Sequence, residues 1–498
     1  MVSNILHTVL LAASLLPLAH AAPADTCKYK GALVNWQLFK TCNHVCNLYT
    51  PTTVAEAQAI VRNSLALGRG VKAVGARHSY TDNLCKENAD FIDMTKLHNI
   101  ISINKDEGWA YFEAGTTFGA LEIALKKEGM TYGFAAPAWP LITVGGALAN
   151  SAHGSGWTTG GPITVPAATL AVDIINPQGE LETITDGDKL AAIKTNLGLL
   201  GVVVRIKYAV HPSRKMRYSL EVVSDKDAIA DGLLSIVEKQ AGTIGWYIPS
   251  FQTIALAKMS HADDYSGPLA SGSAITNTMQ TFRRNVLSKA IACKLALCPS
   301  PISNSSVVPV VGLEEDVIGG VSAVYGDILS VMGKFGIVLP IGVGDDEYAL
   351  PISRHQEAIA AVKATFKEYH DIDISIKGVS AALPFVEIRF APAEDTAYLA
   401  LNTDSDPAVW GQGTVWIEVW FLTSEANENQ IGKFRNALQA RLLALGARPH
   451  WGKTREVTFQ GGVRDRYNGN FAKFEAVRHA MDSKNTFMNE FATRAGIQ

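Results

Sequence analysis

The sequence carries little charge for its length and no marked excess of either sign. Of its 498 residues 18% are charged, and 44 basic against 47 acidic side chains leave a net charge of −3. Because so weak a field does not attract polyanions over long range, we expect no nucleic-acid partner. The hydrophobic content of 47% supplies large buried cores and argues against disorder. The length predicts two or three domains.

Beyond its N-terminus the chain lacks any uninterrupted apolar run of about 18 residues, so no transmembrane span is expected. The N-terminal run "ILHTVLLAASLLPLA" is too short to cross a bilayer. It ends in the small-residue triplet Ala19-His20-Ala21, which is typical of a secretory signal peptide cleaved after about Ala21. We therefore expect residues 1–21 to be a signal peptide and the protein to be secreted, with a buried N-terminal helix as the alternative.

Cysteine is scarce, but its even number agrees with export. Six cysteines could pair in an oxidising compartment in fifteen ways, and Cys293 with Cys298 is the pair we expect. The stretch "CNHVC" around His44 lacks a second cysteine or histidine pair at zinc spacing, so no metal site is predicted. Asn304-Ser305-Ser306 is a glycosylation sequon that matters only in a secreted chain.

Helical and strand patterns alternate along the first two hundred residues, which predicts an α+β region. Residues 54–68 and 117–130 have helical apolar spacing, whereas 71–76, 91–103 and 109–115 are typical of short strands. The turn at residues 176–179 predicts a hairpin. Residues 211–215 form a candidate domain boundary, and three later helices are expected at 225–240, 314–335 and 354–369.

Two stretches rich in small residues are candidates for binding an anion. In "VKAVGARHSYTDNLC" a strand pattern runs into Gly75-Ala76-Arg77-His78-Ser79, and "PLITVGGALANSAHGSGW" contains Thr143-Val144-Gly145-Gly146. Small side chains let backbone N–H groups approach a pyrophosphate closely. Neither stretch is a G-x-G-x-x-G or a Walker loop, so the Rossmann and P-loop interpretations fail. Ordinary glycine-rich turns are the alternative.

Charged residues near the C-terminus are candidates for catalysis. In "FVEIRF" the alternation places Glu387 and Arg389 on one face of a strand, although a surface ion pair would show the same pattern. The stretch "ARPHWGK" brings Arg448, His450 and Lys453 together. Such a cationic cluster could stabilise negative charge that develops on a substrate or cofactor, unless these are ordinary surface residues.

These motifs together resemble the aldonolactone oxidases, the sugar-lactone and alditol oxidase branch of the vanillyl-alcohol-oxidase-type flavoproteins. The resemblance runs from about residue 45 to the C-terminus and is weak between about 215 and 380. The motifs that carry it, in order, are "VKAVGARHSYTDNLC", "FEAGTTFGAL", "TVGGALANSAHGSG", "NLGLLGVVVRIKYAV", "PFVEIRF", and "ARPHWGK" with "FAKFEAVRHAMDSKNTFMNEF".

The resemblance implies a fold and a cofactor. The fold would be α+β, with a two-subdomain FAD-binding domain of the p-cresol methylhydroxylase type at 22–212. A substrate-binding cap domain with an antiparallel sheet flanked by helices would follow at 213–445, and residues 446–498 would return to the FAD domain. FAD would be covalently attached to His78; a dissociable FAD is the alternative. The other residues expected to contact FAD are Gly75, Ala76, Arg77, Ser79, Gly115, Thr143, Val144, Gly145, Gly146, Asn150, His153, Gly154 and Val203.

The resemblance also implies a reaction. Hydride transfer from a hydroxyl-bearing carbon to flavin requires a group that takes the hydroxyl proton and positive charge near the oxygen. Arg389 and Lys453 would supply that charge, and Glu387 would orient Arg389 or accept the proton, with neutral lysine as the other candidate base. His450 either supports them or packs against Trp451. The expected reactants are a sugar, alditol or aldonolactone and molecular oxygen.

Three alternatives remain open from the sequence. The same flavin chemistry could act on a sterol, an aromatic alcohol or a secondary metabolite, because "WYIPS" at 246–250 departs from the lactone-oxidase pattern. A dehydrogenase with another electron acceptor is possible in place of an oxidase. A binding protein that kept the fold without activity is the third. The sequence makes no prediction of oligomeric state.

Overall fold

The computed structural model describes most of the chain outside its N-terminus and parts of its second half. The described residues are 31–36, 40–137, 139–158, 160–229, 233–249, 252–274, 276–277, 309–316, 342–369, 375–376, 379–380, 386–423 and 428–498. The expected signal segment, the Cys293–Cys298 pair and the sequon at Asn304 lie outside these residues, as does most of the helix expected at 314–335.

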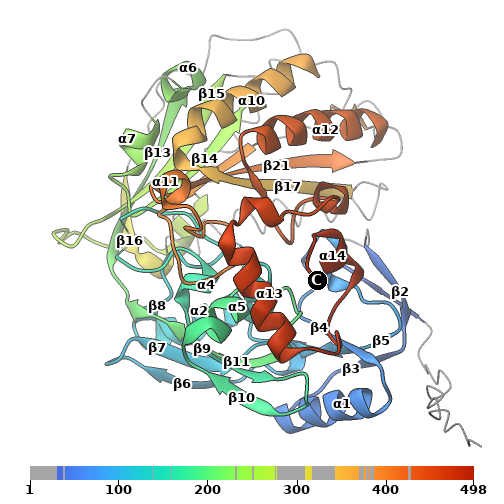
Figure 1. Ribbon diagram of the computed structural model, residues 1–498. Helices are drawn as coiled ribbons and strands as arrows, with labels where there is room; N and C mark the ends of the chain where they lie inside the picture. The colour runs from blue at the N-terminus through green and yellow to red at the C-terminus, as the bar shows by residue number, and fades with distance from the viewer. Residues whose placement is uncertain are drawn as a thin grey trace, which may run out of the picture.

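The two largest sheets of the N-terminal half share a hydrophobic core. Figure 1 shows their strands. The smaller is parallel, in the order β3-β5-β4, and the larger is antiparallel, in the order β10-β9-β11-β7-β6. Val71 and Ile92 from the first sheet pack with Ile175 and Val204 from the second. The strands are β3 (Asn47–Tyr49), β4 (Gly70–Val74), β5 (Ala89–Asp93), β6 (Ile100–Asn104), β7 (Trp109–Glu113), β9 (Thr169–Ile175), β10 (Leu181–Ile184) and β11 (Val202–Ala209).

Local sequence signals fix several of these elements. Helix α1 (Val54–Ala66) begins where the Thr53 side chain accepts a hydrogen bond from the backbone of Glu56, and its buried residues recur at helical spacing. The predicted hairpin is confirmed, since β9 pairs antiparallel with β10 and the Asn176 side chain accepts two backbone N–H bonds within the turn. The stretch 91–103 forms β5 and β6, separated by a 3-10 turn.

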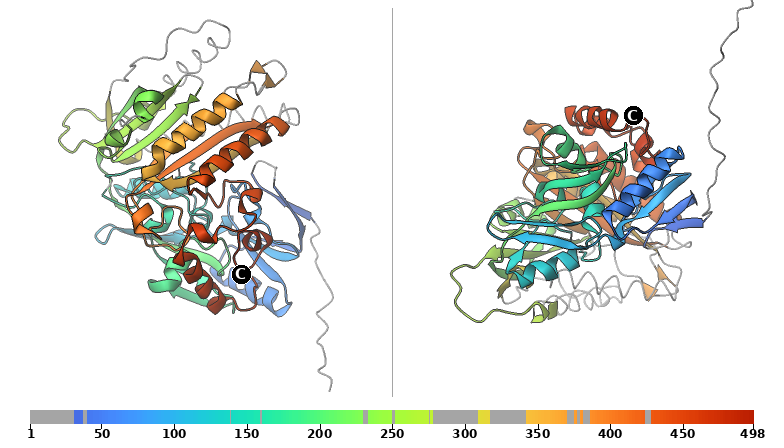
Figure 2. Two further views of the ribbon diagram at one scale, coloured as in Figure 1. Left: turned by 45° about the horizontal axis from the view of Figure 1, so that its top comes forward. Right: turned by 90° about the horizontal axis from the view of Figure 1, so that it is seen from below.

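An eight-stranded antiparallel sheet dominates the second half, in the order β16-β13-β15-β14-β20-β21-β17-β22. Helices α10 (His355–Glu368) and α12 (Glu428–Ala444) lie side by side over its outer face (Figure 2). The strands are β13 (Lys215–Ser224), β14 (Gly242–Ile248), β15 (Thr253–His261), β16 (Val310–Leu313), β17 (Gly342–Pro351), β20 (Val386–Ala391), β21 (Thr414–Thr423) and β22 (Arg448–Pro449).

Of the helices predicted in this half, one forms as expected and another is divided into shorter helices. The helix expected at 354–369 is confirmed as α10, which buries Ile359 and Val362 against the sheet. Within 225–240 the structure describes two short helices, α6 (Asp225–Asp227) and α7 (Leu233–Val237). The mixed helix-and-sheet class and the antiparallel second sheet agree with the predicted fold.

The C-terminal segment leaves β22 and contacts the N-terminal half. The backbone N–H of Tyr80 donates to the carbonyl of Gly452 at 2.7 Å, and the Thr81 hydroxyl donates to the carbonyl of Trp451 at 2.9 Å. Helix α13 (Gly469–Met481) packs on α5 (Gly187–Ile193), and both lie beneath the large sheet in Figure 1. These contacts bring the "HWGK" stretch beside the histidine turn. The domain limits themselves stay predictions.

A disulfide links two segments of the N-terminal half. Cys42 in β2 (Thr41–Val45) is joined to Cys85, which ends the turn after η1 (Asp82–Leu84). Among the helices of the described residues, none is both long enough and apolar enough to cross a membrane.

Candidate active site

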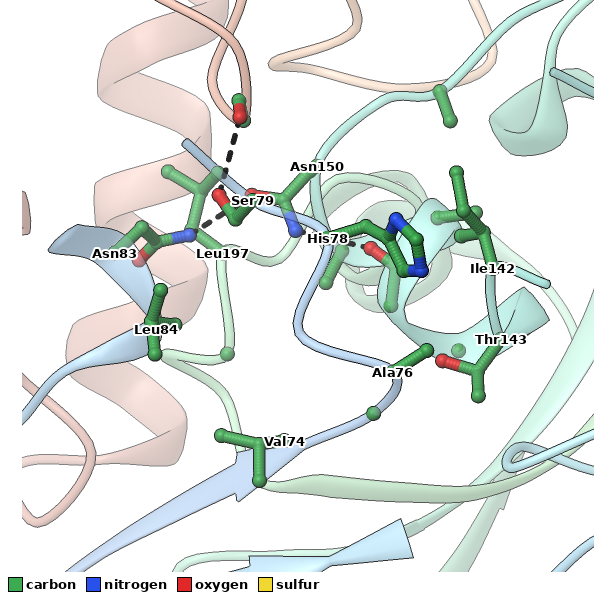
Figure 3. Close-up of a pocket in the computed structure, with 18 of the residues that line it drawn as sticks. Val74, Ala76, His78, Ser79, Asn83, Leu84, Ile142, Thr143, Asn150 and Leu197 are labelled. Atoms are coloured by element: carbon green, nitrogen blue, oxygen red, sulfur yellow. Dashed lines mark hydrogen bonds between the residues drawn. The ribbon is translucent and has the colours of Figure 1, made fainter. Parts of the chain in front are cut away.

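One cavity is lined by both groups of motifs, although they are far apart in the sequence. Figure 3 shows the part of this cavity lined by the histidine turn and by Ile142, Thr143 and Asn150. The histidine turn after β4 and the segment 142–153 line one part of it. Arg389 from β20, Glu347 from β17, and His450 and Lys453 from the C-terminal segment line another. The cavity therefore extends from the N-terminal sheets to the inner face of the large sheet.

The backbone of the histidine turn is arranged to bind an anion. Within the described residues, the N–H groups of residues 76–79 donate no hydrogen bond to the protein, although the turn lines the cavity. Arg77 has a left-handed backbone with φ of 57°, which turns the chain here. A Cβ atom on Gly75 would lie 2.0 Å from Oγ1 of Thr143, so only glycine allows this approach. Consecutive free N–H groups of this kind suit a pyrophosphate.

His78 is held between two tryptophans that were not predicted from the sequence. Its ring stacks on Trp36 at 4.9 Å between centroids, and Trp139 donates its indole N–H to Nε2 at 3.3 Å. Burial lowers the pKa of His78 to about 4. The imidazole is therefore neutral near pH 7. Trp36 and Trp139 lie far from His78 along the chain, so no local sequence signal pointed to them.

The structure brings most of the predicted cofactor residues to the cavity but not all. Four predicted site residues lie outside its lining: Gly115, Val144, Gly154 and Glu387. A Cβ on Gly115 would meet the Met94 carbonyl at 1.9 Å, so this glycine permits close backbone packing. Val144 is fully buried in the hydrophobic core. The remaining predicted residues line the cavity: Gly75, Ala76, Arg77, His78, Ser79, Thr143, Gly145, Gly146, Asn150, His153, Val203, Arg389 and Lys453.

Three glutamates form a row across the large sheet. Glu387 of β20 lies opposite Glu418 of β21, which in turn lies opposite Glu347 of β17. Directly opposed like charges destabilise a sheet, so this row requires cations. Arg389 supplies one: its Nη2 bonds to both Glu347 and Glu418, and its Nε lies 3.2 Å from Oε1 of Glu387. All four side chains are buried, so the surface-pair alternative is wrong.

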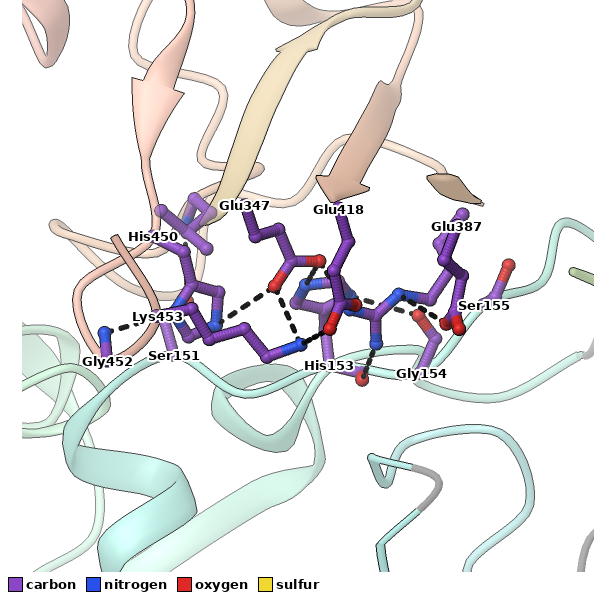
Figure 4. A network of polar contacts seen from close by, with 12 residues as sticks. Ser151, His153, Gly154, Ser155, Glu347, Glu387, Glu418, His450, Gly452 and Lys453 are labelled. Carbon is purple, nitrogen blue, oxygen red and sulfur yellow. Dashed lines mark hydrogen bonds and ion pairs between the residues drawn. The ribbon is translucent and has the colours of Figure 1, made fainter. Parts of the chain in front are cut away.

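Lys453 is the second cation of this cluster (Figure 4). Its Nζ lies 2.6 Å from Glu418, 3.1 Å from Glu347 and 3.7 Å from Asp345, and 24% of the side chain is exposed. Although burial opposes it, the charges of Asp345, Glu347 and Glu418 raise the pKa of Lys453. Lys453 is therefore an ammonium ion at neutral pH, which argues against the neutral-lysine base.

Two histidines face the same carboxylate. Nε2 of His153 lies 3.1 Å from Oε1 of Glu347, and Nε2 of His450 lies 3.7 Å from Oε2. His153 stacks on Trp416 at 3.9 Å between centroids. His450 therefore faces the cluster. The ring of Trp451 stacks on the rings of Phe459 and Tyr467.

The prediction that Arg448 joins this cationic cluster is wrong. Its guanidinium lies over the rings of Trp410 and Tyr467 and donates to the carbonyls of Leu401 and Thr403. Strand β22 ends at Pro449, before His450 and Lys453, so strand alternation does not place the three side chains on one face.

His153, Glu347 and His450 also have the spacing of metal ligands, with one candidate atom of each within 4.8 Å of the others. Glu347, however, already faces the positive charges of Arg389 and Lys453. A divalent ion on the same carboxylate would meet strong repulsion. The donor set therefore suits a proton better than a metal.

Four charged residues of the cavity region were not predicted from the sequence. Asp345 and Glu347 alternate within the strand "GVGDDEYALP", and Glu418 interrupts the apolar strand "TVWIEVWFLT". A carboxylate within an otherwise apolar strand is a sequence signal that could have indicated these three acidic residues. The fourth, Lys72 of β4, lines the cavity and donates to the carbonyl of Leu197 at 3.2 Å. Burial lowers the pKa of Lys72 to about 7.

Comparisons with known proteins identify the class. Residues 47–185 match an FAD-binding domain family. The solved structure of cholesterol oxidase from Brevibacterium sterolicum superposes with a TM-score of 0.66 at 16% identity, over 94% of this chain and 97% of that one. The first match indicates a protein with an FAD-binding domain, and the second shows the fold and confirms the predicted fold class.

The family follows from the second half of the chain. Residues 217–495 match the D-arabinono-1,4-lactone oxidase family, and the chain belongs to it. L-gulono-1,4-lactone dehydrogenase from Mycobacterium tuberculosis is 24% identical over 92% of this chain and 98% of its own. L-gulonolactone oxidase 3 from Arabidopsis thaliana is 25% identical over 94% and 84%. The predicted resemblance is confirmed, and the protein is an FAD-dependent enzyme acting on a CH–OH group.

Proposed function

We propose that this protein is a secreted oxidase that transfers a hydride from a hydroxyl-bearing carbon of an aldonolactone, alditol or sugar to FAD. Molecular oxygen then restores the flavin and leaves as hydrogen peroxide. One observation carries the proposal: a single cavity is lined by the His78 turn and by Arg389 and Lys453. A cofactor bound along that cavity would have its attachment residue and its reacting partners on the same walls.

The residues present fit FAD. The free N–H groups of residues 76–79 and the gap maintained by Gly75 suit its pyrophosphate. When bound, FAD supplies the hydride acceptor, which no protein side chain can supply. The protein's contribution is to orient the substrate and to stabilise the charge on its oxygen. Lys453 and Arg389 are two fixed cations for that purpose, held in place by the row of glutamates.

Covalent attachment through His78 is supported by its environment. A neutral imidazole keeps the lone pair that a nucleophile needs, and burial keeps His78 neutral. Trp139 donates to Nε2, so the lone pair of the neutral ring lies on that nitrogen and the ring hydrogen lies on Nδ1. Acid precipitation of the purified protein tests the link. Yellow colour retained in the pellet is expected, whereas a colourless pellet with a yellow supernatant would establish a dissociable cofactor.

The electron acceptor needs a test of its own, because the relatives include a protein named as a dehydrogenase and others named as oxidases. Anaerobic photoreduction followed by mixing with air separates the two. We expect reoxidation at least as fast as turnover. Slower reoxidation would make the protein a dehydrogenase.

The polar end of the cavity favours a substrate with several hydroxyl groups. His450, Arg389 and Lys453 line it beside Glu347, so a polyhydroxylated compound would find both donors and acceptors there. An oxygen electrode with aldonolactones, alditols, oligosaccharides and aromatic alcohols tests this preference. Consumption with aromatic alcohols alone would refute it.

Secretion is supported by the N-terminal sequence pattern and by the Cys42–Cys85 disulfide, since such bonds persist in oxidising compartments. N-terminal sequencing of the protein recovered from the culture medium tests this. A chain that begins near Ala22 is expected, and protein found only inside cells with residue 2 intact would contradict it.

A further inference from the structure

The hydrogen-bond directions around Glu347 leave one position that needs a proton. Nδ1 of His153 lies 3.0 Å from the carbonyl oxygen of Gly154. A carbonyl can only accept, so Nδ1 carries a hydrogen. The other ring nitrogen, Nε2, then has a lone pair in the neutral ring. It faces Oε1 of Glu347 at 3.1 Å, and two acceptors at that distance repel unless a proton lies between them.

The second histidine does not share this problem. The backbone N–H of Gly452 donates to Nδ1 of His450 at 3.0 Å, so the neutral ring carries its hydrogen on Nε2. That hydrogen points toward Glu347 from 3.7 Å. His450 therefore needs no further proton, because its own hydrogen already lies on the side of Glu347, and the missing proton belongs to the pair formed by His153 and Glu347.

The charges that face this pair make its proton exchangeable. Arg389 from β20 and Lys453 from the C-terminal segment oppose an added proton, whereas Glu418 from β21 and Asp345 from β17 favour it. Burial and Arg389 lower the pKa of His153, and the carboxylate of Glu347 opposes that change. Although burial opposes it, the charges of Arg389 and Lys453 hold the pKa of Glu347 well below its ordinary value, so a proton taken up by the pair is also released.

We propose that the pair of His153 and Glu347 is the acceptor of the hydroxyl proton of the substrate, reached through Lys453. This inference rests on the proposed function and deepens it. Lys453 is the partly exposed member of the cluster, and its Nζ lies 3.1 Å from Oε2 of Glu347. Glu387 lies outside the cavity lining and holds Nε of Arg389, so its role is to position that guanidinium.

The step balances in atoms and electrons. The C–H bond of the substrate breaks and its hydride goes to FAD, while the O–H bond breaks and a carbonyl forms. The hydroxyl proton passes to Nζ of Lys453 as Nζ gives one of its own protons to Glu347. That proton then rests between Glu347 and His153. On reoxidation, molecular oxygen takes the two electrons and the proton that make up the hydride. It also takes the stored proton, and it leaves as hydrogen peroxide.

A proton NMR titration of the oxidised holoenzyme tests the pair without any substrate. A proton shared by an imidazole and a carboxylate resonates far downfield of the amides. We expect such a resonance at low pH and its loss as pH rises. Glu347→Gln should remove it at every pH, because the amide donates to Nε2 instead. A resonance that survives in Glu347→Gln, or one missing from the wild type at every pH, overturns the proposal.

The matched control is Asp346→Asn. Asp346 neighbours Glu347 in β17 but points to the opposite face of the sheet, where Arg435 holds it through two contacts of 2.7 Å. This variant should keep the downfield resonance. It controls for loss of a buried carboxylate from the same strand.

Stopped-flow reduction under anaerobic conditions tests the catalytic role. Only the proton-free pair can accept, so the wild-type reduction rate should rise with pH with the same midpoint at which the resonance disappears. In Glu347→Gln the rate should fall about 100-fold and lose that pH dependence, the loss typical of a missing proton acceptor. An unchanged pH profile in Glu347→Gln overturns the proposal. If no hydroxylated compound reduces the flavin, the proposed function fails, and the NMR titration still decides on the pair.

Discussion

The approach of the histidine turn to Thr143 can be tested by adding a single methyl group. In Gly75→Ala the new Cβ would lie 2.0 Å from Oγ1 and 3.2 Å from Cβ of Thr143, where real contacts are no shorter than 3.0 Å. Threonine is stiff at χ1 and cannot easily turn away. The turn must therefore move by about 1 Å, and overpacking of this size costs about 1–3 kcal/mol.

The cost should appear in both stability and cofactor content. At roughly 2–4 °C per kcal/mol, the melting temperature of Gly75→Ala should fall by about 2–12 °C. The displaced N–H groups of residues 76–79 should also lower the fraction of purified chains that carry flavin, measured from the ratio of visible to ultraviolet absorbance. Gly432→Ala is the control, because its Cβ meets nothing within 4 Å.

A second substitution tests whether the contact with Thr143 causes the effect of Gly75→Ala. Oγ1 of Thr143 is buried and, within the described residues, has no hydrogen-bond partner, so Thr143→Ala removes the obstacle at little cost in hydrogen bonding. The double variant Gly75→Ala/Thr143→Ala should regain flavin content. Wild-type flavin content in Gly75→Ala alone, or no recovery in the double variant, would refute the steric argument.

Three further predictions concern single side chains. Burial lowers the pKa of Lys72 to about 7 from an ordinary value of 10.5, so the charged form is penalised in the folded state. The free energy of unfolding of the flavin-free protein should therefore rise as pH rises from 7 to 10. Urea unfolding should show this gain, and Lys72→Met should abolish it. Trp139→Phe removes the donor to His78 and should lower the fraction of covalent flavin, seen as fluorescence in a denaturing gel. Lys453→Met should slow flavin reduction about 100-fold with partial recovery in Lys453→Arg, and a rate within twofold of wild type would exclude Lys453 from catalysis.

The local sequence determined those parts of the protein that depend on short-range periodicity. Helices α1 and α10 and the hairpin at 176–179 follow from apolar spacing, an N-cap and turn residues close together in the chain. The shared face of Glu387 and Arg389 follows from strand alternation alone. His78 and Lys453 stood out because their small or aromatic neighbours are unusual for surface residues.

Only the tertiary structure decided what surrounds these residues. Glu347 and Glu418 join Glu387 because strand register across β17, β21 and β20 aligns them, and register between distant strands is not encoded in any short window. The same holds for Trp36 and Trp139 around His78, which meet through the packing of separate loops. Arg448 was misplaced for the same reason, since the facing side of a two-residue edge strand depends on its partner. The sequence thus determined which groups are available, and strand pairing in the large sheet determined which of them lie close together.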